Sequence, residues 1–169
     1  MERVLTGSSS ETRLAALYAN HVGAAIGLAR VLTGDDGQAE DVAHEAFIRA
    51  AGRFDHLRRP DAFAAYLRAS VVNECRMRFR RARLERAWKG RQVVPERVDP
   101  PDVETRATLW EAIAVLPWRQ RAALVLRYYE DLPVEQVALL LRCSRRAATG
   151  LIVRGLAQLR AALSWEEEP

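Results

Sequence analysis

The chain has 169 residues, 49% of them apolar and 28% charged, so it can form one compact domain or two small ones and is too apolar to be disordered. Its apolar runs are short, the run at 137–141 being an example, and we expect no membrane insertion, because a spanning helix needs about twenty such residues. Residues 1–13 lack the apolar core of a signal peptide, so we expect a cytoplasmic protein.

The net charge of +4 is unevenly distributed along the chain. Residues 1–48 carry three basic and seven acidic side chains, which is a net charge of −4. Residues 49–91 carry thirteen basic and four acidic side chains, a net charge of +9, and residues 92–169 carry ten and eleven, a net charge of −1. A positive block of this kind is typical of a surface that meets a polyanion, such as nucleic acid, or an anionic membrane.

The residues that commonly carry chemistry are sparse. The two cysteines, Cys75 and Cys143, form no C-x-x-C pair, and the three histidines lie far from both in the sequence. We therefore predict small core residues and neither a disulfide nor a metal site. The sequence holds no G-x-S-x-G motif and no phosphate-binding glycine loop, so we expect no enzyme, no cofactor and no small-molecule substrate.

Helical periodicity dominates the first half of the chain. A helix is predicted over 11–32, and the glycines and aspartates of "TGDDG" at 33–37 end it. A second helix, over about 37–53, begins with acidic residues, which suits the positive end of its dipole. Its apolar side is predicted to consist of Ala39, Val42, Ala43, Ala46, Phe47 and Ala50.

The third predicted helix, over about 61–88, combines a buried stripe with a row of like charges. Val72, Cys75 and Phe79 form the stripe, and six arginines fall between 76 and 86. Arg76, Arg80 and Arg83 recur at i, i+4 and i+7 and so form one row beside the stripe. Like charges this dense destabilise a helix, and contact with nucleic-acid phosphates gives a reason to keep them. A solubilising face, or pairing with the chain's own acids, is the alternative.

The second half of the chain predicts another small helical domain after a linker. Residues 89–103, with three prolines and a glycine, are predicted to be a flexible linker between an 11–88 domain and a 104–163 domain. Helices are predicted over 103–115, 117–129 and 133–141, and from Ser144 to about 163, with Ala122, Leu124, Val125 and Tyr128 of the second facing inward. The last two helices, joined by a short turn with Ser144 as N-cap, describe a helix-turn-helix. The predicted fold class is all-α, with two small helical domains.

The order of these features resembles the sigma factors of bacterial RNA polymerase. The segments "AEDVAHEAF", "RRPDAFAAYLRASVVNECRMRFRR" and "LPWRQRAALVLRYYEDLPVEQVA" look like regions 2 and 4 of that family. Two such domains with a short linker are similar to the extracytoplasmic-function (ECF) group, the minimal two-domain type. The resemblance implies transcription initiation: binding of core RNA polymerase, recognition of promoter DNA and help in opening it.

The resemblance also implies site residues in the first domain. Polymerase binding falls on the second helix, at Asp41, His44, Glu45 and Arg49, although glutamine is common in the family where His44 stands. Minus-ten binding falls on the loop and the arginine-rich helix. Its residues are Asp55, His56, Arg58, Arg59, Asn73, Arg76, Arg80 and Arg83.

The predicted recognition helix departs from the family. Where members often read "GCSxGTVKSRLxR", this chain reads "RCSRRAATGLIVR", and Arg142 replaces the glycine of the turn, where a left-handed conformation costs about 1 kcal/mol. Minus-thirty-five binding is expected to persist with unusual specificity, a weakened or repurposed region 4 being the alternative. The residues expected to contact that DNA are Arg142, Ser144, Arg145, Arg146, Thr149 and Arg154.

Two other readings stay open at the level of sequence. A stand-alone helix-turn-helix regulator explains the second domain but not the acidic and basic helices of the first. A sigma-derived protein could bind polymerase or a sequestering partner without recognising promoters. Members of the family are often silenced by an anti-sigma protein, which is a further partner that the resemblance suggests.

Overall fold

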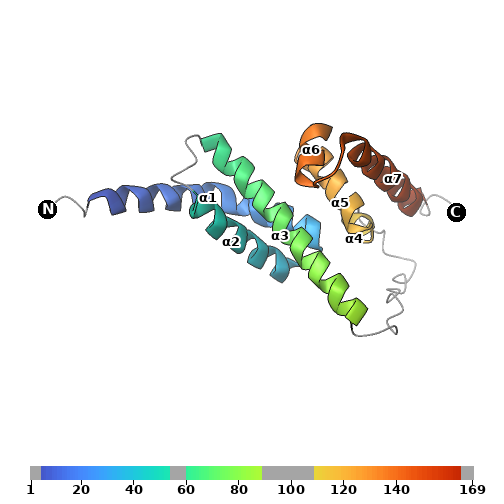
Figure 1. Ribbon diagram of the computed structural model, residues 1–169, viewed down its shortest axis with the longest axis horizontal. Helices are drawn as coiled ribbons and strands as arrows, with labels where there is room; N and C mark the ends of the chain where they lie inside the picture. The colour runs from blue at the N-terminus through green and yellow to red at the C-terminus, as the bar shows by residue number, and fades with distance from the viewer. Residues whose placement is uncertain (1–4, 54–59, 89–108, 165–169) are drawn as a thin grey trace. The chain divides into compact units, whose positions relative to one another are not determined.

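The computed structural model describes residues 5–53, 60–88 and 109–164, with side chains for 12–53, 62–88 and 109–163 (Figure 1). All the regular structure in these ranges is helical, as predicted. The predicted linker 89–103 and the loop residues Asp55, His56, Arg58 and Arg59 lie outside the described residues.

The chain divides into two compact units, Met1–Cys75 and Arg76–Pro169, and the division falls inside helix α3. In the second unit the ring of Phe79 lies 5.7 Å from that of Trp118, centroid to centroid, and the guanidinium of Arg121 lies over the Phe79 ring. The predicted stripe of α3 is therefore buried in its first half only: Val72 and Cys75 are buried, whereas Phe79 is partly exposed.

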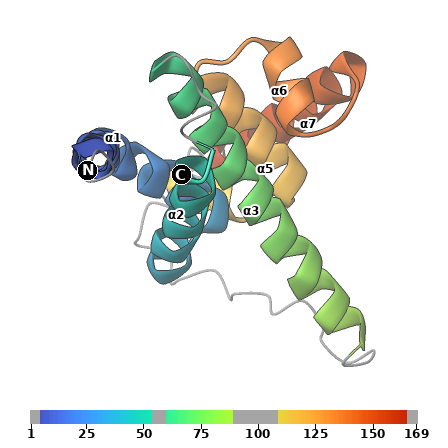
Figure 2. The same cartoon turned by 60° about the vertical axis from the view of Figure 1, so that its left-hand side comes forward.

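The first unit contains α1 (Leu5–Thr33), α2 (Asp36–Ala51) and the first part of α3 (Pro60–Trp88). Helices α1 and α2 lie side by side in Figures 1 and 2, and only a short turn joins them. Gly34 makes this turn with φ of 75°, which costs glycine little. Asp35 then caps α2, because its Oδ1 accepts a hydrogen bond of 2.8 Å from the backbone N–H of Gln38.

Small and aromatic side chains form the core of the first unit. All six residues predicted for the apolar side of α2 are buried, which confirms that prediction. The ring of Phe47 meets that of Phe63 on α3 edge-on at 5.6 Å. Alanine at four of the six α2 positions lets the neighbouring backbones approach closely. The remaining core residues are Ala25, Leu28, Ala29 and Leu32 from α1 and Leu67, Val71, Val72 and Cys75 from α3.

One stretch of α1, Thr12–Thr33, is long and apolar enough to cross a membrane by length and composition, with a mean hydropathy of 1.2. The expectation that no segment approaches that length was therefore wrong by this measure. The finding is weak evidence for a span, since Leu28, Ala29 and Leu32 are buried in the core with α2 and Arg30 interrupts the stretch. A core helix passes the same test.

The second unit contains α4 (Leu109–Ala114), α5 (Trp118–Leu124), the π-helical turn η2 (Val125–Tyr129), α6 (Val134–Leu140) and α7 (Arg145–Ser164). Ala122, Leu124 and Val125 are buried as predicted, but Tyr128 is 59% exposed, so its inward placement was wrong. The turn explains the error: the N–H of Glu130 bonds the carbonyl of Val125, five residues back, at 3.0 Å. This wider turn shifts later side chains off the α-helical period.

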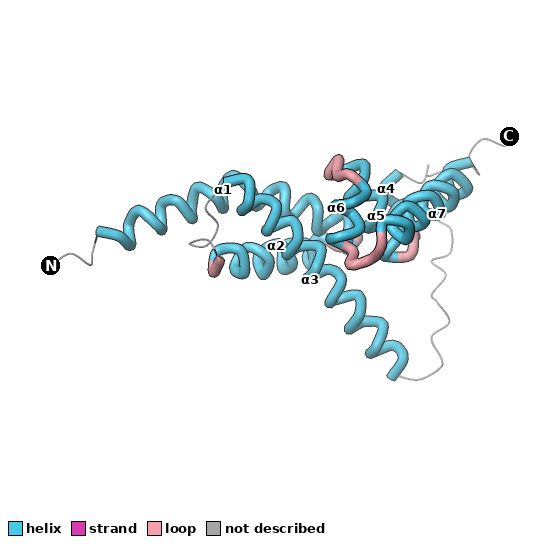
Figure 3. Tube along the Cα trace, turned by 45° about the horizontal axis from the view of Figure 1, so that its top comes forward, coloured by secondary structure: helices cyan, strands magenta, loops and turns pink. Residues whose placement is uncertain are grey.

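Helices α6 and α7 form the predicted helix-turn-helix, and Figure 3 shows the short connection between them. Arg142 adopts φ of 50° in the turn, the left-handed conformation that the missing glycine would have eased. Ser144 is the N-cap of α7, since its Oγ accepts a hydrogen bond of 3.1 Å from the N–H of Ala147. Val137 and Ala138 of α6 are buried, as are Ala148 and Ile152 of α7.

Gly155 permits a close approach of α7 to α5. A Cβ at this position would lie 3.0 Å from Cδ1 and 3.1 Å from Cγ of the buried Leu124, and 3.4 Å from Cβ of Gln120. At Gly150, one turn earlier, a Cβ would meet only the end of the Arg154 side chain. The two glycines of α7 thus differ in what surrounds them.

We expect Gly155→Ala to lower the free energy of unfolding by about 1 kcal/mol, because overpacking of about 1–3 kcal/mol outweighs a helix-propensity gain of about 1 kcal/mol. Gly150→Ala is the matched control and should raise it by up to about 1 kcal/mol, since a flexible side chain can move aside. Urea unfolding followed by circular dichroism measures both. Equal effects of the two substitutions would contradict the close packing at Gly155.

Candidate nucleic-acid and polymerase interfaces

The second half of α3 presents an arginine face. Arg80, Arg81 and Arg83 are exposed, and within the part of the chain that the structure describes none of them forms an ion pair. Arg76 and Asn73 are partly buried nearer the core. The predicted row is therefore present, with its later members facing solvent.

Burial and nearby positive charge both act on Arg76. Burial lowers the pKa of its guanidinium below the ordinary value, and repulsion from Arg142, Arg119 and Arg80 lowers it further. The group nonetheless stays charged at neutral pH, because a guanidinium is effectively always protonated in proteins. The helix thus keeps its charges at some cost in stability.

The exposed side of α2 carries all four predicted polymerase contacts. They are Asp41, His44, Glu45 and Arg49, and each is exposed. Ile48, which the sequence analysis missed, lies on the same face at i+7 from Asp41 and is 69% exposed. The signal for Ile48 was present in the sequence as one large apolar residue on the polar side of an amphipathic helix. Such an exposed anchor within a polar rim is typical of protein interfaces.

The ring of His44 is fixed from two sides. Its Nε2 lies 2.9 Å from the hydroxyl of Tyr18 on α1, and its Nδ1 lies 3.1 Å from the carbonyl oxygen of Glu40. A ring that donates from Nδ1 to this carbonyl accepts the Tyr18 hydroxyl proton at Nε2. The Tyr18 ring in turn packs edge-on against Phe47 at 4.9 Å, so a core residue orients this surface side chain.

The fourth predicted contact, Arg49, has a structural partner. Its Nη2 lies 2.9 Å from Oε2 of Glu74 on α3, a residue that is only 4% exposed, and 4.0 Å from Oε2 of Glu45. The Arg49–Glu74 distance is that of a close ion pair, although its angles fall short of hydrogen-bond geometry. A buried carboxylate needs a partner of this kind, so Arg49 holds α2 to α3.

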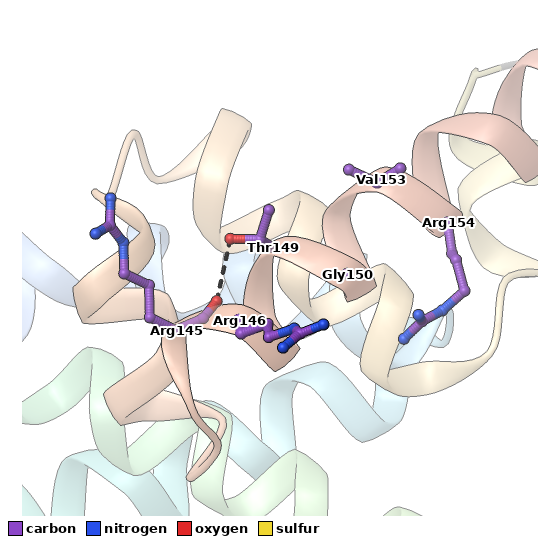
Figure 4. Close-up of a pocket in the computed structure, with 6 residues that line it drawn as sticks. All are labelled: Arg145, Arg146, Thr149, Gly150, Val153 and Arg154. Carbon is purple, nitrogen blue, oxygen red and sulfur yellow. Dashed lines mark hydrogen bonds between the residues drawn. The ribbon is translucent and has the colours of Figure 1, made fainter.

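The exposed side of α7 forms an open hollow (Figure 4). Six residues line it: Arg145, Arg146, Thr149, Gly150, Val153 and Arg154. Arg145 is paired with Glu135 of α6 through an Nε–Oε1 distance of 2.8 Å. The other two predicted residues, Arg142 and Ser144, make the turn and the cap described above. The hollow therefore brings four of the six predicted residues together.

A second hollow in this unit, of about 300 Å³, is lined almost wholly by apolar side chains. Trp110 and Tyr129 stand at its edge, half-exposed, with their rings edge-on at 6.1 Å. The sequence analysis missed this hollow, because it depends on the outward turn of Tyr128 and Tyr129 at η2. Its other lining residues are Leu109, Ile113, Leu124, Val125, Leu156 and Leu159.

The described side chains include no group of three or more His, Cys, Asp or Glu residues that could hold a metal ion. Cys75 is buried and Cys143 partly so, and neither forms a disulfide. The surfaces above consist of charged, amide and apolar groups suited to binding.

Comparison with known proteins matches both halves of the chain. Residues 17–85 match the model of "Sigma-70 region 2" and residues 106–159 that of "Sigma-70, region 4". The RNA polymerase sigma-E factor of Streptomyces avermitilis is 32% identical over 142 residues, which cover 80% of this chain and 76% of the relative. The RNA polymerase sigma-H factor of Pseudomonas aeruginosa is 31% identical over 159 residues, covering 85% and 81%.

Solved structures show the same fold. The sigma factor RpoE of Bartonella quintana, solved with the anti-sigma factor NepR, matches with a TM-score of 0.64 at 19% identity, over 91% of this chain and 96% of that one. CnrH, solved with the cytosolic domain of CnrY, matches with a TM-score of 0.63 at 25% identity, over 98% and 99%.

The fold and its surfaces define a two-part helical protein with a helix-turn-helix. The chain belongs to the ECF group of the sigma-70 family of RNA polymerase sigma factors. It is a transcription initiation factor and not an enzyme, and its partners are core RNA polymerase and promoter DNA. The alternative of a stand-alone regulator does not account for the match of residues 17–85 to region 2.

We expect Arg49→Met to lower the free energy of unfolding by about 2 kcal/mol, because it removes the ion pair that Arg49 forms with the buried Glu74. Adding Glu74→Gln should restore part of the loss, since a neutral amide costs less to bury than a carboxylate. Chemical denaturation of the single and double variants measures this coupling.

Arg30→Ala is the control for that prediction, since it removes an ion pair with Asp36 in which both side chains are mostly exposed. Its expected cost is below about 1 kcal/mol. If Arg49→Met cost no more than Arg30→Ala, the structural role of Arg49 would be wrong.

Proposed function

We propose that the chain divides the work of a sigma factor among three surfaces: the outer side of α2 binds core polymerase, the arginine face of α3 binds minus-ten DNA, and the exposed side of α7 binds minus-thirty-five DNA. One observation carries most weight. Arg80, Arg81 and Arg83 stand exposed on α3 without an ion pair in the described part of the chain. A positive surface that the described residues do not pair is suited to a polyanion.

The minus-ten assignment joins the arginine face to Asn73, which lies further back along α3. Guanidinium groups bind phosphate oxygens through paired N–H donors and release counterions when they do so. Arg80 and Arg83, about one turn apart, can reach successive phosphates of one strand. The proposal for Asp55, His56, Arg58 and Arg59, capture of an unpaired base, rests on the family resemblance alone.

The polymerase assignment rests on Asp41, His44, Glu45 and Ile48. The carboxylates provide charge complementarity, and Ile48 provides the apolar area that a polar rim surrounds. Arg49 contributes by holding the helix in place, and Tyr18 by orienting His44. The surface is thus organised by contacts with α1 and α3.

The minus-thirty-five assignment rests on the N-terminal half of α7, the part of a recognition helix that reaches base edges in the major groove. Arg145 forms an exposed ion pair with Glu135, whereas Arg146 and Arg154 have no ion pair among the described residues. The divergent sequence of this helix supports an unusual promoter preference.

An anti-sigma protein is a further proposed partner. Two structural neighbours were solved with such a protein or with a partner's cytosolic domain, and the apolar hollow beside Trp110 and Tyr129 offers a surface for an apolar helix. Recovery of the chain from uninduced cells with no bound protein would argue against this. We also infer a cytoplasmic location, because sigma-E and sigma-H relatives act with RNA polymerase.

We expect Arg80→Ala and Arg83→Ala each to reduce the amount of open complex about tenfold on every promoter, since each removes a charge-assisted contact worth about 1.5–3 kcal/mol. Permanganate reactivity of unpaired thymines, with holoenzyme reconstituted from core polymerase, measures opening. Arg30→Ala, an exposed arginine on α1, is the control and should leave opening unchanged. Normal opening by both α3 variants would refute the assignment.

We expect Asp41→Ala and Ile48→Ala each to weaken binding to core polymerase by roughly tenfold, because we propose that both belong to the minority of interface residues whose truncation costs more than about 1 kcal/mol. Fluorescence anisotropy of the labelled chain titrated with core enzyme measures the affinity. Glu85→Gln removes an exposed carboxylate at the far end of α3 and should bind normally. Unchanged affinity in both α2 variants would show that the contact lies elsewhere.

A further inference from the structure

The guanidinium of Arg154 occupies the space that a side chain at residue 150 would fill. A Cβ at Gly150 would lie 3.2 Å from Nη1, 3.6 Å from Nη2 and 3.7 Å from Cζ of Arg154, and these are its three nearest atoms. Figure 4 shows the Arg154 side chain turned back along α7 toward Gly150. Helical side chains lean toward the N-terminus, so a residue at i+4 can cover a glycine at i.

The two methyl-bearing side chains of the hollow lie one turn apart on the same side of the helix. Thr149 donates its hydroxyl to the carbonyl of Arg145 at 3.1 Å, so its polar group is bonded within the helix and its methyl group is left for an outside contact. Val153, at i+4, is 59% exposed. An exposed valine beside two guanidinium groups is not explained by packing.

Together these features form a surface suited to a guanine next to a thymine in the major groove. A guanidinium forms two parallel hydrogen bonds with O6 and N7 of guanine, and apolar side chains contact the methyl group of thymine in the major groove. Arg154 is close to both Thr149 and Val153 in sequence and on the helix face, and no ion pair occupies its donors among the described residues. Arg145, by contrast, forms an exposed ion pair with Glu135.

We propose that Gly150 is a specificity-determining position. Because residue 150 lacks a side chain, the Arg154 guanidinium is positioned on the recognition surface. There Arg154 binds a guanine next to a thymine, and Thr149 and Val153 contact that thymine. This inference rests on the proposed role of α7 in binding minus-thirty-five DNA. Gly150 is the positioning residue and Arg154 the residue that touches the base. Glycine lowers the helix propensity at this position, but its missing side chain leaves room for the Arg154 guanidinium.

The experiment uses holoenzyme made from the full chain and core polymerase on a promoter library randomised across the minus-thirty-five element. Arg154→Ala should reduce the preference for guanine at one position about tenfold. Gly150→Ala should reduce it at the same position by a smaller factor, although the arginine is intact, because a Cβ 3.2 Å from Nη1 forces the guanidinium to shift. The double variant should lose no more than Arg154→Ala alone.

The controls distinguish loss of base recognition from loss of folding. Arg160→Ala removes an exposed arginine further along α7 and should leave every base preference unchanged. Gly150→Ala is expected to stabilise the helix, so loss of preference in that variant cannot be attributed to unfolding. Val153→Ala should weaken the preference for the adjacent thymine and spare the guanine.

Each other outcome overturns a named part of the proposal. If Arg154→Ala lowers transcription equally on all sequences, Arg154 contacts phosphate and does not read a base. If Arg154→Ala relaxes the guanine preference but Gly150→Ala does not, Gly150 does not position the Arg154 guanidinium. If Arg146→Ala alone changes preference, Arg154 is not a reader, although α7 still binds; if neither arginine variant has any effect, the assignment of α7 to minus-thirty-five DNA itself fails.

Discussion

Uncompensated positive charge on α3 is the constraint on which the rest of the protein depends. Arg80, Arg81 and Arg83 have no ion pair within the described residues, and the pKa of Arg76 is lowered by burial and by the neighbouring arginines. A helix with so much like charge would be unstable alone, and it is held by its buried first half, from Phe63 to Cys75. The same helix is thereby both a core element and a charged surface.

The stability of the first unit and its proposed binding surfaces share residues. Arg49 lies among the predicted polymerase contacts, yet it neutralises the buried Glu74 of α3. His44 lies on the proposed polymerase face, yet Tyr18 and the Glu40 carbonyl fix its ring. Loss of polymerase binding in an Arg49 variant therefore has two physical sources, and only stability measurements separate them. In the second unit, Gly155 gives α7 its close contact with α5, and Gly150 leaves its outer side open to Arg154.

Much of the fold follows from local sequence. The six buried residues of α2 were predicted because a short amphipathic helix with an alanine-rich face has one way to pack. The Ser144 cap and the left-handed Arg142 followed from the chemistry of helix starts and turns. Tyr128 was misplaced because a π-helical turn has no period-based signal in a single sequence. The long apolar stretch of α1 was underestimated because small residues and isolated polar ones interrupt it.

The candidate sites were predictable only in part. Rows of charge on α2, α3 and α7 are visible in the sequence, because one helix sets the spacing. The Arg49–Glu74 and Arg145–Glu135 pairs join different helices, and the assignment of Arg49 and Arg145 to binding was made without them. The position of the Arg154 guanidinium over Gly150 depends on the conformation of one side chain, which the sequence does not reveal.

The salt dependence of promoter binding tests the central claim most directly. The equilibrium constant of the holoenzyme for promoter DNA, measured over a series of salt concentrations, gives the number of phosphates that the protein neutralises. If the arginine face of α3 binds DNA backbone, the Arg80→Ala/Arg83→Ala double variant should show a log–log slope shallower by about 1.4 to 1.8, because each lost contact removes about 0.7 on single strands and about 0.9 on duplex. A slope identical to that of the unaltered chain would contradict the claim.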